Sequence, residues 1–435
     1  MGFSSSFQQG LSGLTAAQRG LEVIANNVSN SSVVGFKSST ASFADVFARA
    51  FNGGDSINNI GLGTSLSAVT QNFKQGNITV TGNPLDLAIN GTGFFKTQAP
   101  DGSFLYTRNG QFNLDNSNVI VNTNGDKLTG YPIDQTTGKV TDVAGPITVS
   151  KAAIEPSAST TTSLETNLDA RQAAISPTVT FDPANLSSYN NSTSMTVYDQ
   201  LGNSHTMSIY LRKESTNNWS AYAALDGTQV DVGLSPVTPT TAPAQSAAGA
   251  LSFTADGALV TPANAQFEVD LSRYVTAAGV PFSSTGSTPN KFTFDLSKTT
   301  QYGSSFAIQN LSQNGYASSP FAGFNVGTDG TLAINYANGQ TKNIAKVGLY
   351  KFNNPEALQP VGSNGWKATE AAGPELVSLS DDTAFGTIQS GALEESNVDL
   401  TAELVAMISA QRVYQANSQS IKTQDSLLQT ITNLR

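Results

Sequence analysis

The two ends of the chain carry apolar side chains at alternating spacings of three and four residues. This is the period of helices that pack along a shared seam, as in coiled coils. Residues 3–28 fill six of seven such positions with apolar residues, and residues 399–435 fill seven of ten. Ser396 or Asn397 is expected to cap the second helix, with Asp399 beside it. We therefore expect one long helix at each end, with a seam made by Phe7, Leu11, Leu14, Leu21, Ala25 and Val28 and by Leu400, Leu404, Met407, Tyr414, Ile421, Leu428 and Ile431.

These apolar stripes are not expected to be covered within one chain. Gly10, Gly13 and Gly20 each cost the first helix about 1 kcal/mol relative to alanine. A single pair of helices leaves much of its apolar surface in water, whereas each large apolar side chain that is buried contributes about 1.5–3 kcal/mol. The stripes could form the core of one globular domain, but these magnitudes favour an interface with other copies of the chain.

The stretch "ANNVSNSSVVGFK", residues 25–37, is expected to end the first helix, because asparagine tolerates the left-handed conformation that ends helices. Gly35 permits backbone angles that other residues avoid. Phe36 is then expected to anchor the chain, while Lys37 stays in solvent. Residues 33–36 form an apolar cluster without an evident core of their own, so we expect this segment to dock onto a neighbouring copy.

Everything between the two helices has the pattern of strands and turns. Residues 78–134 alternate apolar and polar side chains between Asp-Gly and Asn-Gly turns, which favours hairpins. Residues 194–225 predict a meander with a hairpin turn at 201–203. The composition shifts to proline, serine, threonine and alanine over residues 145–180, which indicates a domain boundary. One core is expected from Phe94, Phe95, Phe104, Tyr106, Phe112, Leu114, Leu128 and Tyr131.

The expected fold class is therefore mainly β with long terminal α-helices, in an elongated chain of several domains. The terminal helices form a coiled-coil core domain, and two β-rich domains follow in series. The predicted divisions are a terminal-helix domain at 1–28 and 397–435, a linker region at 29–72 and 373–396, an inner β domain at 73–145 and 316–372, and an outer β domain at 146–315.

Charge and composition exclude several classes of partner. The formal net charge is −10 and no basic cluster occurs, so we expect no nucleic-acid partner. No apolar run approaches the roughly 18 residues that span a bilayer, so we expect no membrane insertion. The chain has no cysteine, which excludes disulfides and cysteine chemistry. No cleavable secretory signal is recognisable, so export would require another route.

Enzymatic chemistry is not expected. The single histidine, His205, follows the predicted turn at 201–203 and has no recognisable nucleophile or orienting partner. The GxSxG, GxxxxGK[ST] and HExxH motifs do not occur. Residues 115–118, "DNSN", lack the glycine and glutamate that complete a calcium loop. We therefore expect no catalytic, cofactor-binding or metal-binding residues and no cofactor.

Several stretches resemble the bacterial flagellar rod and hook family of axial proteins. The stretch "ANNVSNSSVVGFKSSTASFADVFA" is similar to the signature that follows the first helix in these subunits. The C-terminal "SGALEESNVDLTAELVAMISAQRVYQANSQSIKTQDSLLQTITNLR" resembles their C-terminal helix. The stretches "FLYTRNGQFNLD", "LTGYP" and "TVYDQLGNSH" resemble parts of their β domains.

The resemblance implies a structural subunit of the flagellar hook. Such a subunit assembles with itself into a curved, flexible tube, a universal joint that transmits torque from rod to filament. Implied partners are the rod and hook–filament junction proteins, and the hook cap and type III flagellar export apparatus during assembly. The implied location is extracellular, in the basal body and hook of the flagellum. The polymer interface would contain the helical seam residues given above together with Val34, Gly35 and Phe36.

Two other functions remain open. A distal rod subunit shares the terminal motifs, but the large insert at 146–315 favours a hook subunit. A non-flagellar extracellular β-rich surface protein would explain the composition, since only 12% of the residues are charged against a usual value near 25%. The periodic stripes at both ends argue against it.

Overall fold

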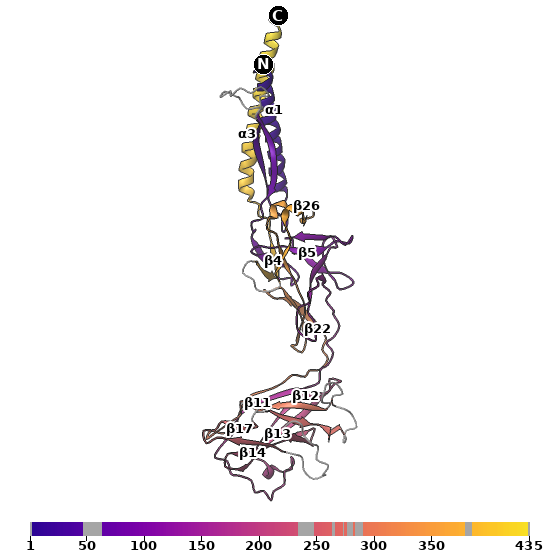
Figure 1. Cartoon of the computed structure of the whole chain (residues 1–435), viewed down its shortest axis with the longest axis vertical. Helices are drawn as coiled ribbons and strands as arrows, with labels where there is room; N and C mark the ends of the chain where they lie inside the picture. Colours follow the sequence, from indigo (N-terminus) through magenta and orange to yellow (C-terminus); the bar gives the residue numbers. More distant parts are fainter. Residues whose placement is uncertain are drawn as a thin grey trace. The chain divides into compact units, whose positions relative to one another are not determined.

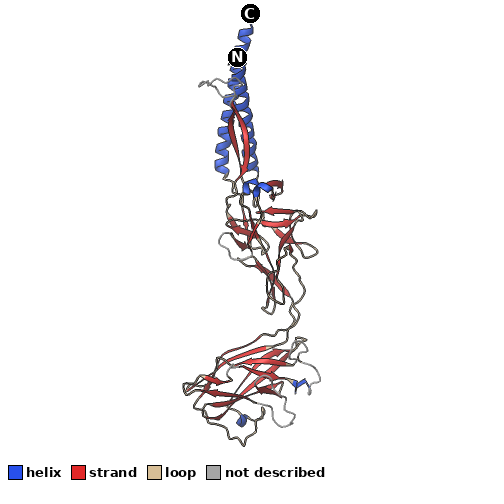
Figure 2. Ribbon diagram, in the orientation of Figure 1, coloured by secondary structure: helices blue, strands red, loops and turns tan. Residues whose placement is uncertain are grey.

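Helices at both ends flank a chain that is otherwise built mainly from strands (Figure 2). The computed structural model describes residues 2–46, 63–233, 248–262, 266–272, 274–275, 282, 290–378 and 385–433. The chain divides into two compact units. The first unit contains residues 1–151, 322–335 and 341–435, and the second unit contains residues 152–321 and 336–340. The fold is thus mainly β with more than one β-rich part, as predicted; the finer domain boundaries stay a prediction.

The terminal helices are α1 (Gly2–Ser29) and α3 (Leu400–Asn433), which lie side by side and antiparallel (Figure 1). The cap of α3 differs from the expected one. Asp399 Oδ1 accepts hydrogen bonds from the amides of Thr401 and Ala402, at 2.9 and 3.1 Å. Asp399 is therefore the N-cap, because the side chain of Asn397 is engaged elsewhere. None of the described helices is long and apolar enough to cross a membrane.

An antiparallel hairpin packs along α1, where the sequence predicted a linker. It consists of β1 (Ser39–Val46) and β2 (Gly63–Gln71), while the intervening residues 47–62 lie outside the described part of the chain. The amide of Thr64 donates a hydrogen bond to Ser12 Oγ at 3.3 Å. Apolar side chains of the hairpin, such as Phe43, face the helix beside Gly20. The first unit therefore has a third element along its helices.

The β-rich part of the first unit contains one large sheet and several short strand pairs. The sheet order is β22-β23-β24-β9-β5-β6-β27-β26, with β10, β7 and β8 attached to its side. Its strands are β22 (Phe321–Val326), β23 (Thr331–Tyr336), β24 (Thr341–Lys346), β9 (Lys127–Pro132), β5 (Phe95–Gln98), β6 (Phe104–Thr107), β27 (Gly365–Lys367), β26 (Gln359–Gly362), β10 (Gly145–Pro146), β7 (Phe112–Leu114) and β8 (Ile120–Asn122). The antiparallel pairs are β3 (Ile78–Val80) with β30 (Ala392–Glu394), β4 (Leu87–Asn90) with β29 (Thr387–Ser390), and β25 (Leu349–Lys351) with β28 (Leu376–Ser378). Two short helices, η2 (Pro355–Ala357) and η3 (Glu370–Ala372), also belong to this unit.

Aromatic side chains form the core of this sheet. Phe94, Tyr106 and Tyr131 pack with Tyr350 and Trp366, which come from the C-terminal half of the chain. Several of these rings meet edge to face, the geometry that aromatic pairs favour. The predicted core was therefore right for these positions, although its partners are distant in sequence.

Phe104 is a correction to the predicted core, because its side chain is exposed. Phe104 lies at the start of β6, directly after the turn at 101–102. There its ring covers the ammonium group of Lys96, with Nζ 4.4 Å from the ring centroid. A cation–π contact of this kind stabilises an aromatic ring that stays partly in solvent.

The second unit is a separate sheet structure. Its sheet order is β12-β13-β14-β15-β18-β19-β11-β20, with β16, β17 and β21 attached. The predicted meander is confirmed as β12, β13 and β14, and the predicted turn lies between the first two. The elements are β11 (Thr161–Asp169), η1 (Leu186–Ser188), β12 (Asn191–Tyr198), β13 (Ser204–Ser215), β14 (Asn218–Leu225), β15 (Thr228–Gly233), β16 (Gly249–Phe253), β17 (Leu259–Thr261), β18 (Gln266–Asp270), β19 (Lys291–Asp295), β20 (Thr300–Tyr302) and β21 (Ala307–Gln313). Their inward-facing side chains form one continuous core around Trp219.

Candidate functional site: the terminal helices

Glycines on α1 allow α3 to approach closely. A Cβ at Gly10 would lie 3.0 Å from Ile421 Cγ1, and a Cβ at Gly13 would lie 2.9 Å from Asn417 Nδ2. These glycines weaken the isolated helix, as the sequence indicated, but they also create the surface on which α3 packs. Helix pairs with small residues at the contact can bring their backbones unusually close.

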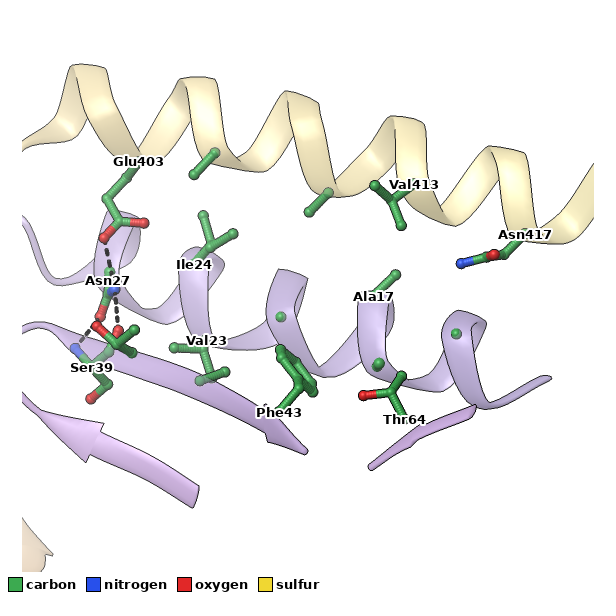
Figure 3. A pocket seen from close by; sticks show the side chains of 17 residues that line it. Ala17, Val23, Ile24, Asn27, Ser39, Phe43, Thr64, Glu403, Val413 and Asn417 are labelled. Atoms are coloured by element: carbon green, nitrogen blue, oxygen red, sulfur yellow. Dashed lines mark hydrogen bonds between the residues drawn. The ribbon is translucent and has the colours of Figure 1, made fainter. Parts of the chain in front are cut away.

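An apolar cavity of about 610 Å³ lies between the two helices and the hairpin (Figure 3). Small and apolar side chains line most of it, and one end is closed by the polar side chains of Asn27 and Glu403. Ala406, Ala410 and Val413 enter it from α3, whereas Ala17 and Ile24 enter from α1. The face of α3 that meets α1 therefore passes through 406, 410, 413 and 417.

The opposite face of α3 carries an exposed apolar ridge. Leu400, Leu404 and Ile408 follow one another at four-residue spacing, and 45%, 45% and 51% of their surfaces are exposed. We call these three residues the α3 ridge. Leu400 and Leu404 do not line the cavity between the helices, whereas Ala406, Ala410 and Val413 do.

The other predicted seam residues differ in how far the single chain covers them. Exposed side chains are those of Phe7, Leu11, Ala25 and Tyr414. Half-buried side chains are those of Leu14, Leu21, Val28, Met407 and Ile421. The side chains of Leu428 and Ile431 lie outside the described residues. Whether these positions contact other copies stays a prediction.

The segment after α1 is buried within its own chain. Phe36 and Gly35 are buried, and Val34 is half-buried, with its carbonyl accepting a hydrogen bond from Asn364 Nδ2 at 2.9 Å. Gly35 has φ +69°, and a Cβ there would lie 2.5 Å from the backbone nitrogen of Asn109. The expectation that this segment lacks a core was wrong, because residues beside β6 and β27 of the large sheet pack against it.

Lys37 is a second correction, since it does not stay in solvent. Only 1% of its surface is exposed, and its Nζ lies 2.7 Å from Glu394 Oε1 and 2.7 Å from the carbonyl oxygen of Lys74. The sequence contains both charges, but they are separated by more than 350 residues. Nothing in the local pattern around Lys37 indicates that they meet.

Sequence models of flagellar protein families match four parts of the chain. The model described as "Flagella basal body rod protein" matches residues 7–37, and "Flagellar hook protein FlgE/F/G D1 domain" matches residues 88–169. The model "Flagellar basal body protein FlaE D2 domain" matches residues 167–316, and "Flagellar basal body rod FlgEFG protein C-terminal" matches residues 389–434. The paired helices and the segment after α1 thus fall largely in the two rod models, and residues 88–316 fall in the other two models.

Full-length relatives decide the family. The flagellar hook protein FlgE of Escherichia coli (strain K12) is 40% identical over 432 residues, covering 99% of this chain and 100% of that relative. The hook protein FlgE of Salmonella typhimurium (strain LT2) is 38% identical over 435 residues, with coverage of 99% and 100%. The chain belongs to the flagellar hook protein family. A more distant hook protein FlgE, from Rhizobium meliloti (strain 1021), is 30% identical and is covered over its full length.

A solved structure shares the fold of this hook-family chain. The crystal structure of the Helicobacter pylori flagellar hook protein FlgE2 superposes with a TM-score of 0.51 over 72% of this chain and 99% of that one. The two sequences are only 11% identical over the matched part, so this likeness concerns the fold alone.

His205 has partners that the sequence did not indicate. Its Nδ1 lies 2.7 Å from Asp226 Oδ2 and its Nε2 lies 3.5 Å from Asp199 Oδ2, while Tyr274 Oη lies 3.2 Å from both Nδ1 and Asp226 Oδ2. Asp199 and Asp226 lie in the β12–β13 and β14–β15 turns, His205 lies in β13, and Tyr274 follows β18. Among the described residues no group of three or more His, Cys, Asp or Glu could hold a metal ion. The cluster is best explained as a set of polar contacts that holds the β14–β15 turn against the start of β13.

The stability that these polar contacts give the second unit depends on pH, because they involve the ionised carboxyl group of Asp226. Burial opposes its ionisation, but hydrogen bonds from His205 and the Thr206 amide outweigh that effect and lower the pKa of Asp226. A lowered pKa means that the ionised group stabilises the fold at pH values above its unfolded pKa, near 3.9. This stability is lost as the pH falls through the lower folded pKa.

Asp226→Asn is therefore expected to lower the melting temperature of the second unit at pH 7 but to have little effect near pH 2. Trp219 fluorescence in a Trp366→Phe background would follow the melting, because Trp219 is the remaining tryptophan and lies in the second unit. Asp256→Asn is the matched control, since Asp256 is exposed in the same unit. Equal destabilisation at both pH values would show that Asp226 acts through packing rather than charge.

Proposed function

We propose that this chain is the structural subunit of a bacterial flagellar hook and polymerises through its terminal helices into a curved, flexible tube. The observation that carries the proposal is the α3 ridge. Three large apolar side chains remain half in water on a helix whose other face is already occupied by α1. Burying each of them fully is worth about 1.5–3 kcal/mol, so copies that cover one another's ridges gain substantially.

In such a tube the paired helices would form the inner, coiled-coil wall. The face of α3 toward α1 of the same chain lines the cavity at 406, 410 and 413 and contacts the α1 glycines at Asn417 and Ile421. The ridge on the opposite face is then available for a neighbouring copy. Two apolar faces on one helix are typical of helices that pack on more than one partner.

The same proposal gives the partners and the location. A hook subunit joins the rod at one end and the hook–filament junction at the other, and it meets the hook cap and export apparatus during assembly. The polymer lies outside the cell and transmits torque from rod to filament as a universal joint. No enzymatic role is proposed, and a net charge of −10 supports the absence of a nucleic-acid partner.

A distal rod subunit remains the alternative, because two of the matching family models are rod-type. The full-length match to hook proteins favours the hook, since it includes the large second unit. Electron microscopy of assembled protein would separate the two functions. Curved tubes support a hook subunit, whereas straight and stiff tubes support a rod subunit.

Leu404→Asp is expected to prevent tube formation while leaving both units folded. A carboxylate in an apolar contact between copies is costly to desolvate, but in the free chain it would face water, because Leu404 is half-exposed. Sedimentation and electron microscopy would measure assembly, and circular dichroism would measure folding. Ser409→Asp is the matched control, since it adds the same charge at an exposed position of α3 outside the ridge. Normal tubes from Leu404→Asp would rule out the ridge as an assembly contact.

A further inference from the structure

The two ends of the chain meet in a polar junction at the base of the helices. Asn27 is buried at the end of α1; its Nδ2 donates hydrogen bonds to the Ser39 carbonyl oxygen and to Glu403 Oε1, at 2.8 and 2.9 Å (Figure 3). Asn397, just before α3, accepts a hydrogen bond from the Ser38 amide at 2.8 Å and donates one to the Asn72 carbonyl oxygen at 2.7 Å. Residues 27–39 and 392–403 are therefore joined through side chains.

Glu394 lies at the centre of this junction, and each of its side-chain oxygens and its backbone carbonyl oxygen accepts a hydrogen bond. Its side chain is fully buried, and Oε1 accepts hydrogen bonds from Lys37 Nζ at 2.7 Å and from the Gly76 amide at 2.8 Å. Oε2 accepts a hydrogen bond from Arg108 Nη1 at 2.9 Å. The backbone carbonyl oxygen of Glu394 accepts one from the Gly35 amide, also at 2.8 Å. One residue thus holds three separate chain segments, at 35–37, 76 and 108.

The charges in the junction are not balanced one to one. Two buried cations, Lys37 and Arg108, face the single carboxylate of Glu394. Backbone carbonyl oxygens partly compensate the excess positive charge. Lys37 Nζ also donates a hydrogen bond to the carbonyl oxygen of Lys74, and Arg108 Nη2 donates one to that of Gly91 at 2.9 Å. Burial lowers the pKa of Lys37, and the Glu394 carboxylate opposes that shift.

A buried cluster of this kind is an inefficient way to gain stability. Removing each ion from water costs several kcal/mol, and a well-packed apolar replacement is often as stable or more stable. Hydrogen-bonded ion pairs, unlike apolar contacts, accept only a narrow range of geometries. The cluster therefore specifies an arrangement more than it adds stability.

We propose that Lys37, Arg108, Glu394 and Asn397 form an internal lock that fixes the direction in which the terminal helices and the β1–β2 hairpin leave the β-rich part of the first unit. Glu394 acts as the positioning residue, and Arg108 attaches the lock to the loop after β6. The signature residues around 25–37 then act inside one chain rather than as contacts between copies. The inference concerns the single chain and does not depend on the proposed function.

The lock can be tested on the full-length free protein by measuring a distance across it. The chain has no cysteine, so Ser42→Cys on β1 and Lys127→Cys on β9 give two unique spin-label sites at exposed positions. Double electron–electron resonance spectroscopy is expected to give a narrow distribution of the distance between the two labels in the parent protein. Glu394→Gln should broaden it at least twofold, because an amide removes the negative charge that faces two buried cations and leaves only one acceptor oxygen on side chain 394. The amides of Gly35 and Gly76 should also exchange with solvent at least tenfold faster.

Two further variants keep the test decisive. Glu395→Gln, an identical change at the adjacent exposed residue, should leave both measurements unchanged. Lys37→Met keeps the Arg108–Glu394 ion pair and most of the apolar stem of the side chain, so it should leave the sheet folded while still broadening the distance. A narrow distribution and slow exchange in folded Glu394→Gln or Lys37→Met protein would overturn the proposal. Equal broadening in Glu395→Gln would also overturn it.

Discussion

Removal of residues 399–435 is expected to abolish tube formation completely while both β-rich parts of the chain remain folded. The deletion takes away the α3 ridge and also uncovers the face of α1 that α3 packs against. The shortened chain still contains β30, so the pairing of β3 with β30 and the contacts of Glu394 remain in place. The core around Trp219 in the second unit contains no residue from α3.

Electron microscopy and sedimentation would measure assembly of the shortened chain, and the near-ultraviolet circular dichroism spectrum would report its aromatic cores. A chain that loses only residues 430–435 is the matched control, since it keeps the α3 ridge and the contacts of Asn417 and Ile421 with α1. Tubes formed by the chain without residues 399–435 would place the principal assembly contacts in the β-rich units.

Gly35→Ala is expected to destabilise the first unit more than a simple loss of backbone freedom can explain. Its positive φ alone costs a side-chain-bearing residue about 1–2 kcal/mol. The new Cβ would also lie 2.5 Å from Asn109 N and 2.6 Å from Arg108 C, and these are backbone atoms that cannot rotate away. Overpacking of this kind costs about a further 1–3 kcal/mol.

Gly102→Ala separates the two effects. Gly102 also has a positive φ, of +87°, but a Cβ there meets nothing within 4 Å. Urea unfolding followed by Trp366 fluorescence in a Trp219→Phe background reports the first unit alone, because the chain has only these two tryptophans. Gly35→Ala should lose at least about 1 kcal/mol more than Gly102→Ala. Equal losses would mean that the close approach to Asn109 relaxes without cost.

The sequence predicts the elements of this chain better than it predicts their contacts. Periodic apolar residues identified both helices, and Gly202 identified the hairpin between β12 and β13, because these signals are local. The burial of Lys37 and Gly35 was not predictable, since their partners come from residues 74–109 and 394. Polar residues that pair across such distances look like solvent-exposed residues when only their neighbours in sequence are considered.

Two smaller errors have the same origin. Asn397 has good N-cap chemistry, but its side chain is engaged with Ser38 and Asn72, so the neighbouring Asp399 caps α3 instead. Similarly, His205 gains its partner Asp226 only because the β14–β15 turn folds back beside the β12–β13 turn. In both cases tertiary contacts decide which of several suitable side chains takes a role.

The lock around Glu394 also makes the two ends of the gene interdependent. A chimaera that combines the first 40 residues of one hook protein with the last 45 of another brings together halves of a buried ion cluster that were not selected together. Because Arg108 supplies the second cation, the middle of the chain contributes to the match as well. Grafting terminal helices between relatives therefore requires that Lys37, Arg108, Glu394 and Asn397 be transferred together.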